Sequence, residues 1–228
     1  LDPGVKDNDI FADPTLFAMQ QYRDFLGREG DPQGVAFWAG QVTWMVRTRA
    51  QVIESFMASP EFQDTTASVI RLYLAYFGRY PDEGGLRFWS AYHRSGHSLE
   101  EISGLFAGSA EFAERYGALS NEDFVFLVYA NVLGRSPDAG GFAFWRSQLD
   151  SGALTRGAVM LQFSESAEFQ SLARNPVFAT MLYIATMRRA PDAQGYAFWL
   201  GQLNGGTPAT SVIDAFIRSP EYRARFLP

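Results

Sequence analysis

The chain has 228 residues with 19 basic and 25 acidic side chains, so its formal net charge is −6, and a basic nucleic-acid-binding surface is not expected. Apolar residues make up 47% of the sequence and charged residues 19%, which supplies a sizeable core and excludes an intrinsically disordered chain. The sequence contains no cysteine, so disulfides, thiolate zinc sites and cysteine nucleophiles are excluded. No apolar run approaches the ~18 residues that a membrane-spanning helix requires.

The N-terminal residues 1–14 are expected to form an acidic linker or loop, because the first twelve residues are largely polar and acidic. The first helix is expected to begin at Asp13-Pro14, since a capping residue followed by proline is typical of a helix start. The helix carries an apolar stripe with helical spacing. It is expected to end at Gly27, because glycine readily adopts the left-handed backbone that closes a helix.

From this helix onward the sequence repeats itself four times. Each copy contains Gly-Arg, an aspartate, a glycine and Phe-Trp in the same order, and closes with Ser-x-Glu and an aromatic residue; in the fourth copy arginine replaces the first glycine. The aspartates are Asp31, Asp82, Asp138 and Asp192, spaced by 51, 56 and 54 residues. Such a regular period over nearly the whole chain predicts a helical repeat protein.

Each copy is predicted to contain three helices. The first helix ends before the Gly-Arg pair, and the second begins at the aspartate, whose side chain can accept backbone N–H groups as an N-cap. The third begins at a threonine or serine, as at Thr48, where Gln51 completes a capping box. Glycines end the second helix in the later copies, namely Gly96, Gly152 and Gly206. The first copy instead has Trp44 and Met45 in that region.

The predicted fold class is all-α, with four tandem repeats of about 50 residues, each about three helices, packed into a compact or gently curved helical array. A repeat of this size cannot bury its apolar face alone, so neighbouring repeats are expected to share a core. We expect residues 15–113 to hold repeats 1 and 2, residues 114–123 to form a connector, and residues 124–228 to hold repeats 3 and 4. One continuous stack is the alternative.

The order helix, Gly-Arg-x-Pro-Asp-x-x-Gly-x-x-Phe-Trp, helix, Ser-x-Glu-Phe resembles the bacterial domain-of-unknown-function 4214 repeat in all four copies, over roughly residues 15–225. The resemblance implies a secreted or cell-surface protein, because members of that family are often large exported proteins with adhesin-like, calcium-repeat or carbohydrate-active domains. It implies no catalytic residue. The Gly-Arg-x-Pro-Asp stretch is also distantly similar to the phycobilisome linker polypeptides, which tend to be basic whereas this chain is acidic.

The recurring charged and aromatic residues have structural interpretations. We expect the arginine of each Gly-Arg pair to pair with a carboxylate at a helix junction, where the glutamate of the closing signature recurs in every copy. The four recurring tryptophans are expected in the core rather than on a glycan-binding platform, because large aromatic side chains dominate burial. Trp44 falls outside the repeat pattern, so Trp44 and Met45 are the candidate ligand-binding residues, as an exposed contact patch or an edge seal.

No catalytic, metal or cofactor site is predicted. The sequence contains no nucleophile elbow, phosphate-binding loop or zinc-protease helix, and only two histidines are available for general-base chemistry. His93 and His97 have the i, i+4 spacing of two metal ligands, but Ser95-Gly96 is expected to break the helix and a third ligand is missing.

The sequence therefore favours a non-catalytic extracellular or cell-surface module that binds polysaccharide or anchors a larger protein to an envelope or matrix. The alternative is a protein–protein interaction scaffold with no carbohydrate ligand. The expected partner is a polysaccharide or cell-surface glycan, or a protein chain, with no nucleic acid and no membrane insertion. Exposed Trp or Tyr rings flanked by polar and charged side chains would favour the glycan, whereas clustered Leu, Met and Phe would favour the protein partner.

Overall fold

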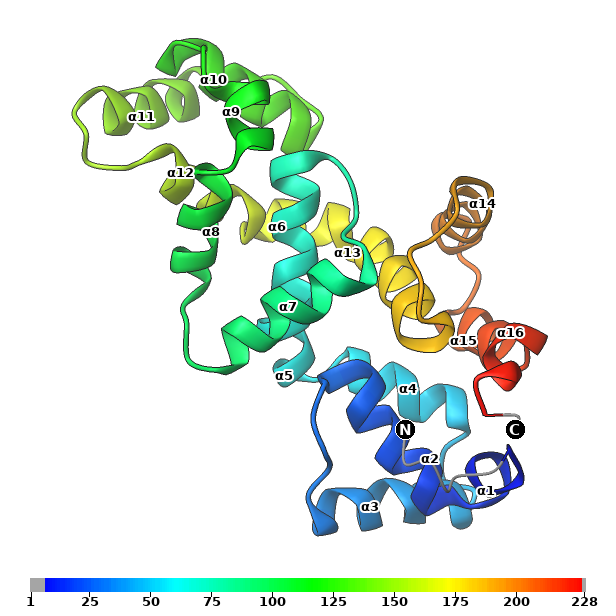
Figure 1. Cartoon of the computed structure of the whole chain (residues 1–228). Helices are drawn as coiled ribbons and strands as arrows, with labels where there is room; N and C mark the ends of the chain where they lie inside the picture. The colour runs from blue at the N-terminus through cyan, green and yellow to red at the C-terminus, as the bar shows by residue number, and fades with distance from the viewer. Residues whose placement is uncertain (1–6, 227–228) are drawn as a thin grey trace. The chain divides into compact units, whose positions relative to one another are not determined.

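The computed structural model describes residues 7–226, and every regular element in that range is an α- or π-helix (Figure 1). The prediction of an all-α helical repeat fold is therefore confirmed. The chain divides into two compact units. Unit 1 comprises residues 1–66 and 178–228, and unit 2 comprises residues 67–177.

Unit 1 combines the first and the fourth repeat. The helices before the first boundary are α1 (Asp7–Ala12), α2 (Pro14–Gln21), η1 (Tyr22–Leu26), α3 (Pro32–Thr43), α4 (Arg49–Met57) and α5 (Pro60–Phe62), followed by η2 (Gln63–Ala67), which ends at the boundary. The helices after the second boundary are the end of α13 (Ala167–Leu182), η4 (Tyr183–Met187), α14 (Ala193–Asn204), α15 (Ala209–Ile217) and α16 (Pro220–Ala224). The third helices of the two repeats, α4 and α15, pack against each other, and η1 contacts η4.

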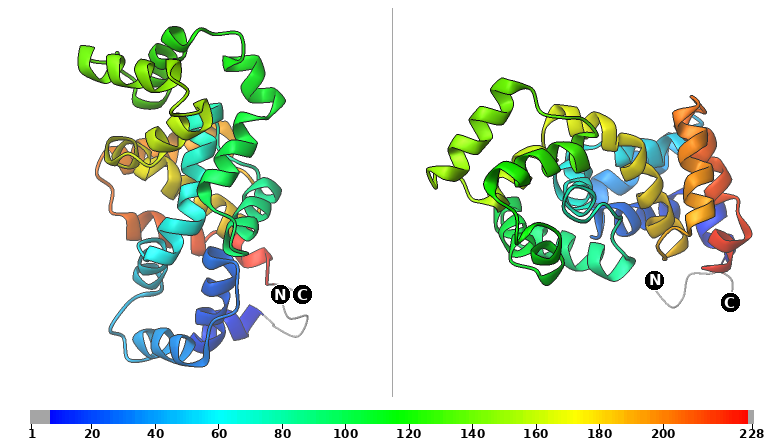
Figure 2. Two further views of the ribbon diagram at one scale, coloured as in Figure 1. Left: turned by 90° about the vertical axis from the view of Figure 1, so that its left-hand side faces the viewer. Right: turned by 90° about the horizontal axis from the view of Figure 1, so that it is seen from above.

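Unit 2 combines the second and the third repeat in the same way. Its helices are α6 (Ser68–Phe77), α7 (Glu83–Arg94), α8 (Leu99–Ala107), α9 (Ala110–Tyr116), α10 (Asn121–Val128), η3 (Tyr129–Leu133), α11 (Ala139–Asp150), α12 (Arg156–Ser164) and most of α13. The third helices, α8 and α12, pack against each other as α4 and α15 do in unit 1. Helix α6 contacts α7, α8, α9 and α12 and is seen almost end-on among them in Figure 2, so it forms the centre of this unit.

The helix boundaries follow from the recurring residues. In each repeat the aspartate side chain accepts a hydrogen bond from the backbone N–H of the glycine three residues later, which caps the second helix. These Oδ1 to N distances are 2.8, 2.7, 2.8 and 2.8 Å at Asp31, Asp82, Asp138 and Asp192. The residue directly before the recurring arginine has a left-handed backbone in every repeat. The φ angles are 64°, 59°, 66° and 56° at Gly27, Gly78, Gly134 and Arg188.

The core of each repeat is a cluster of three aromatic rings, one from each helix. In repeat 1, Tyr22 meets Phe56 edge-on with ring centroids 4.9 Å apart, and Trp38 packs on the same phenylalanine at 5.2 Å. The same arrangement joins Tyr73, Trp89 and Phe106; Tyr129, Trp145 and Phe163; and Tyr183, Trp199 and Phe216. The recurring tryptophans are half-buried, so they pack in these clusters with part of each ring accessible.

The expected division into repeats 1 and 2 (15–113) and repeats 3 and 4 (124–228) differs from the division in the structure. The contacts pair repeat 1 with repeat 4 and repeat 2 with repeat 3. In unit 1, the buried carboxylate of Asp24 in η1 pairs with Arg188 and Arg225 of repeat 4 at 2.5 and 3.0 Å. Charge pairing and helix packing between segments far apart in sequence, which a repeat period does not encode, decide the grouping.

In unit 2, repeats 2 and 3 are joined by buried hydrogen bonds and an ion pair at other positions of the repeat. The buried hydroxyl of Tyr76 donates to the carbonyl oxygen of Ser103 at 2.8 Å, and the Ser103 hydroxyl donates to the carbonyl oxygen of Gly157 at 2.9 Å. Arg71 adds an ion pair with Glu165 at 2.6 Å. Each unit therefore has its own polar joint between two repeats.

Two further boundaries differ from the expectation. Residues 1–14 were expected to form a linker, but residues 7–12 form helix α1. This helix is held in place because Ile10 is buried and Phe11 packs edge-on against Tyr222 and Phe226. Residues 1–6 of the expected linker lie outside the described residues. The expected connector at 114–123 contains the break between α9 and α10. This break lies inside unit 2, however, and the unit boundaries fall at the continuous helical stretches around residues 66–67 and 177–178.

Candidate functional site

The recurring Arg and Glu residues form a bidentate ion pair in every repeat, so the expected brace is confirmed. The guanidinium Nε and a terminal nitrogen donate to the two carboxylate oxygens, which is the fork geometry that arginine favours. The pairs are Arg28 with Glu61, Arg79 with Glu111, Arg135 with Glu168 and Arg189 with Glu221. Because these charged groups are paired within their own repeat, we do not treat them as candidate ligand-binding groups.

Each brace also covers the tyrosine of the aromatic cluster. Arg28, for example, lies over the Tyr22 ring with 5.0 Å from its guanidinium carbon to the ring centroid. The hydrogen bond from Arg79 lowers the pKa of Glu111, and Arg135 does the same to Glu168. The repeat junction is thus a packed structural unit of Arg, Glu and Tyr.

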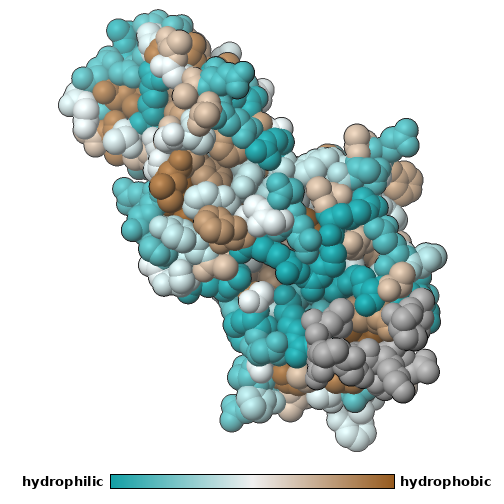
Figure 3. Space-filling model, in the orientation of Figure 1, coloured by the Kyte–Doolittle hydropathy of each residue, from teal (hydrophilic) through white to brown (hydrophobic). Residues whose placement is uncertain are grey.

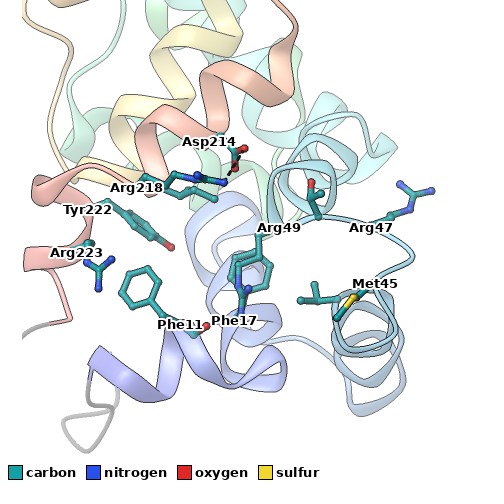
Figure 4. Close-up of a pocket in the computed structure, with 12 residues that line it drawn as sticks. Phe11, Phe17, Met45, Arg47, Arg49, Asp214, Arg218, Tyr222 and Arg223 are labelled. Atoms are coloured by element: carbon teal, nitrogen blue, oxygen red, sulfur yellow. Dashed lines mark hydrogen bonds and ion pairs between the residues drawn. The ribbon is translucent and has the colours of Figure 1, made fainter.

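A pocket of about 520 Å³ opens in unit 1, where α1, α2 and α4 of the N-terminal part face α15 and α16 (Figure 4). Its aromatic lining consists of Phe11, Phe17 and Tyr222, and its charged lining consists of Arg47, Arg49, Arg218, Arg223 and Asp214. This volume is typical of sites for small molecules or parts of larger ligands. The lining carries four arginines and one acid, in a chain whose net charge is −6.

Arg49 occupies the middle of this pocket. It begins helix α4, donates from Nη2 to the carbonyl oxygen of Phe11 at 2.6 Å, and lies over the Phe17 ring at 5.3 Å. Its Nε is buried and has no hydrogen-bond acceptor among the described residues. Burial lowers the pKa of Arg49, because removal from water disfavours the charged form. An anionic group close to this guanidinium would offset that cost.

The other three arginines lie around Arg49 (Figure 4). Arg223 lies over the Phe11 ring at 5.0 Å, and Arg218 approaches Asp214 at 3.5 Å, which is a weak pair on a highly exposed side chain. Arg47 lies beyond Met45 at the outer edge and donates to the hydroxyl of Ser55. Arg49, Arg218 and Arg223 therefore form the charged part of the pocket, and Arg47 lies at its rim.

The two predicted ligand-binding residues follow the end of helix α3. Trp44 and Met45 are 80% and 90% exposed, and Val46 continues the exposed apolar segment. Met45 lines the pocket, whereas Trp44 is its sequence neighbour and does not. The backbone of Met45 has φ of 53°, a left-handed conformation that a non-glycine residue adopts at a cost of roughly 1 kcal/mol.

The other repeats place glycine where repeat 1 places Met45. Gly152 and Gly206 make the same backbone hydrogen bond, to the residue three positions earlier, that Met45 makes to Val42. All of these positions are left-handed, so glycine is the unstrained choice. Repeat 1 therefore carries a large exposed side chain at a position where the fold itself favours none.

Sequence reasoning identified Trp44 and Met45 but missed the arginines of the pocket. Arg218 and Arg223 lie 169 or more residues after Arg47 and Arg49 in the chain, so spacing alone does not bring them together. One signal was available for Arg47, Arg218 and Arg223: the other copies mostly carry uncharged residues at the same positions. A comparison of the copies position by position would have found them.

Other candidate sites are accounted for by local structure. His93 Nδ1 lies 2.7 Å from the carbonyl oxygen of His97, and the His97 ring stacks on Tyr92 at 3.7 Å. Within the described part of the chain, no three His, Asp or Glu side chains come together in a way that could hold a metal ion. None of the described helices combines the length and apolar composition needed to cross a bilayer.

Comparisons with known proteins identify a family without assigning a function. The family described as "Domain of unknown function (DUF4214)" matches residues 12–66, 103–173 and 171–226. These are three segments rather than four, and most of the second repeat lies between them. A search of the curated proteins and a search of the solved structures each found no match, so the similarity to phycobilisome linker polypeptides gains no support.

Proposed function

This chain belongs to the DUF4214 family, and we propose that it serves as a non-catalytic module that binds polysaccharide outside the cell. In that role it attaches the protein that carries it to an envelope or matrix. The proposal includes a secreted or cell-surface location, in keeping with the exported proteins whose repeat it resembles. We further propose that residues 67–102 belong to a fourth copy of the family repeat, because together with Phe106 and Glu111 they form the same cap, brace and aromatic cluster.

The observation that carries this proposal is the pocket of unit 1 with its exposed rim. Sugar rings are bound by aromatic or apolar faces together with polar groups at their edges. The pocket offers the half-buried ring of Phe11 beside three guanidinium groups, with the exposed Met45 in its lining and the exposed Trp44 preceding Met45 in the chain. Shape, aromatic area and hydrogen-bond donors thus occur in one place.

Binding rather than catalysis fits the chemistry of these residues. Arginine remains protonated at physiological pH, so it donates hydrogen bonds but does not act as a general base. The carboxylates that recur in each repeat cap helices or pair with the braces. The pocket therefore holds groups that recognise a ligand.

The test is a glycan-array screen with the purified chain, followed by calorimetry on each hit. We expect Trp44→Ala to weaken the affinity roughly fivefold, which corresponds to the loss of one aromatic contact. Phe144→Ala is the matched control, because Phe144 is a 52% exposed aromatic residue in unit 2, away from the pocket lining. No glycan hit with the folded chain would refute the proposal.

A protein–protein scaffold is the second candidate, and one specific observation favours it. The second helix of every repeat exposes the phenylalanine that precedes the half-buried tryptophan. These residues are Phe37, Phe88, Phe144 and Phe198, and they are 55%, 60%, 52% and 54% exposed. Apolar patches interrupt the hydrophilic surface in Figure 3, as expected for contacts of this kind. Loss of a captured partner protein in a variant with all four changed to serine, with the glycan array negative, would support this candidate instead.

A further inference from the structure

Three of the four arginines that line the unit 1 pocket have no counterpart in unit 2, although the two units are built alike. The equivalent positions follow from the repeat alignment, which the shared hydrogen bonds confirm: Arg47 and Leu154 both donate their backbone N–H to the carbonyl of the glutamine six residues earlier. At the positions of Arg47, Arg218 and Arg223, unit 2 has Leu154, Gly108 and Ala113. The fold of a repeat pair therefore forms without these three arginines.

The fourth arginine is present in both units but has different partners. In unit 2, Arg156 donates to the carbonyl oxygens of Tyr116 and Leu119 at 2.7 and 2.5 Å, and it lies over the Phe124 ring at 4.9 Å. In unit 1, Arg49 keeps the aromatic contact with Phe17 but donates to one carbonyl oxygen only, and its buried Nε has no acceptor among the described residues. The guanidinium at this position therefore donates to two carbonyl oxygens in unit 2, whereas in unit 1 one of its buried N–H groups lacks an acceptor among the described residues.

We propose that the unit 1 pocket binds the anionic group of an acidic polysaccharide, with Arg49, Arg218 and Arg223 holding the carboxylate of a uronic-acid residue. This inference rests on the proposed polysaccharide-binding function and names the class of its ligand. Guanidinium forks match carboxylates, and hydrogen bonds to charged groups are about twice as strong as those between neutral groups. A uronate also fits the lining as a whole, because its ring face is apolar enough to pack on the half-buried ring of Phe11.

The apolar rim strengthens the assignment to a sugar polymer. A free inorganic anion needs only the guanidinium groups and gains nothing from the neighbouring Trp44 or Met45. These two residues are almost fully exposed, and Met45 retains a left-handed backbone that glycine adopts without strain in the other repeats. A strained backbone that occurs in only one of the four repeats points to a role for the Met45 side chain. Contact with the sugar units on either side of the bound uronate would be such a role.

The experiment uses oligogalacturonates and their methyl esters, which have the same sugar ring with and without the charge. We expect the intact chain to bind the acid at least tenfold more tightly than the ester, with the difference shrinking as salt is raised. Arg49→Gln and Arg223→Gln are each expected to lose about tenfold in affinity for the acid, and Arg218→Gln about threefold because its side chain is 79% exposed. Thermal unfolding of each variant checks that it is folded.

The matched control is Arg87→Gln in unit 2. Arg87 forms an i, i+4 ion pair with an acidic residue, as Arg218 does, and it is also more than half exposed. This variant changes the net charge equally, so it should leave the affinity for the acid unchanged. Dextran sulfate and dextran form a second acid and neutral pair that separates carboxylate from sulfate recognition.

The outcomes separate the two proposals. Equal affinity for acid and ester, or loss of binding in Arg87→Gln as large as in Arg218→Gln, would overturn the anion site while leaving polysaccharide binding intact. Preference for dextran sulfate over both galacturonate forms would overturn the carboxylate assignment. Failure to bind any glycan on the array would overturn the function on which the inference rests.

Discussion

Replacement of Asp24 by asparagine removes the carboxylate that pairs with Arg188 and Arg225 at the joint between repeats 1 and 4. The Asp24 side chain is 1% exposed and pairs with Arg188 and Arg225, whose side chains are 28% and 9% exposed. Breaking a buried ion pair by removing one partner costs about 3–5 kcal/mol, because the remaining charge is left uncompensated. Arg225 also donates to the carbonyl oxygens of Ala185 and Thr186, so we expect the lower end, about 3 kcal/mol.

Unit 2 shows how the same joint is built without this anion. The residues equivalent to Asp24, Arg188 and Arg225 are Asn131, Gly78 and Arg115. We therefore expect Arg188→Gly to rescue Asp24→Asn by about 1–2 kcal/mol, because it removes one unpaired cation and relieves the left-handed backbone at φ 56°. Arg188→Gly alone should change the stability by about 1 kcal/mol or less, since a partly exposed pair is lost and strain is relieved.

The assay is urea unfolding followed by circular dichroism, with Tm as a second readout. For a chain of this size, 3 kcal/mol corresponds to a fall in Tm of roughly 6–12 °C. An Asp24→Asn variant within 1 kcal/mol of the wild type would refute the view that this triad holds repeats 1 and 4 together. A double variant no more stable than Asp24→Asn would refute the equivalence of the two joints.

Three further predictions concern the repeat itself. Met45→Gly should raise the free energy of unfolding by about 1 kcal/mol, because glycine adopts the left-handed backbone without strain, while calorimetry shows weaker polysaccharide binding; a destabilised variant would contradict this. Gly195→Ala should cost about 1–3 kcal/mol in urea unfolding, since its Cβ would overlap the Tyr183 hydroxyl, whereas Gly201→Ala on the same helix meets nothing within 4 Å and should be neutral or stabilising. Arg79 holds the pKa of Glu111 below its usual value, so the stability that this pair contributes is present above the usual pKa of glutamate and is lost as the pH falls below about 4. Calorimetric scans from pH 7 to pH 3 should show Tm falling in that range. A flat profile would argue against a contribution from the braces.

Much of the fold followed from local signals in the sequence. The aspartate caps, the closing Ser-x-Glu signature and the three helices per repeat depend on contacts within a few residues or within one repeat, and these recur in the structure. Arg188 shows the limit of local reasoning. It replaces the expected glycine, and its partner Asp24 is 164 residues away, so neither the pairing of repeats 1 and 4 nor the closure of that helix could be inferred from the repeat alone.

The candidate site was predictable only in part, for the same reason. Trp44 and Met45 stood out because they interrupt the repeat, and both are exposed. Arg49 did not stand out, because Arg156 occupies the same place in the third repeat, and only the hydrogen bonds distinguish the two. A helix start occupied by arginine is unremarkable in sequence; the missing acceptor at its Nε becomes visible only in three dimensions.

Because repeat 1 pairs with repeat 4, the two units can fold at different stages of chain synthesis. Unit 2 is one continuous segment, residues 67–177, so all of its contacts become available once that segment has left the ribosome. Unit 1 needs residues from both sides of it, and its Asp24 finds Arg225 across 201 residues. Loop closure over that length is slow and costs entropy. Unit 2 should therefore fold during synthesis, while the pocket of unit 1 is completed last and is lost first when the C-terminal repeat is removed.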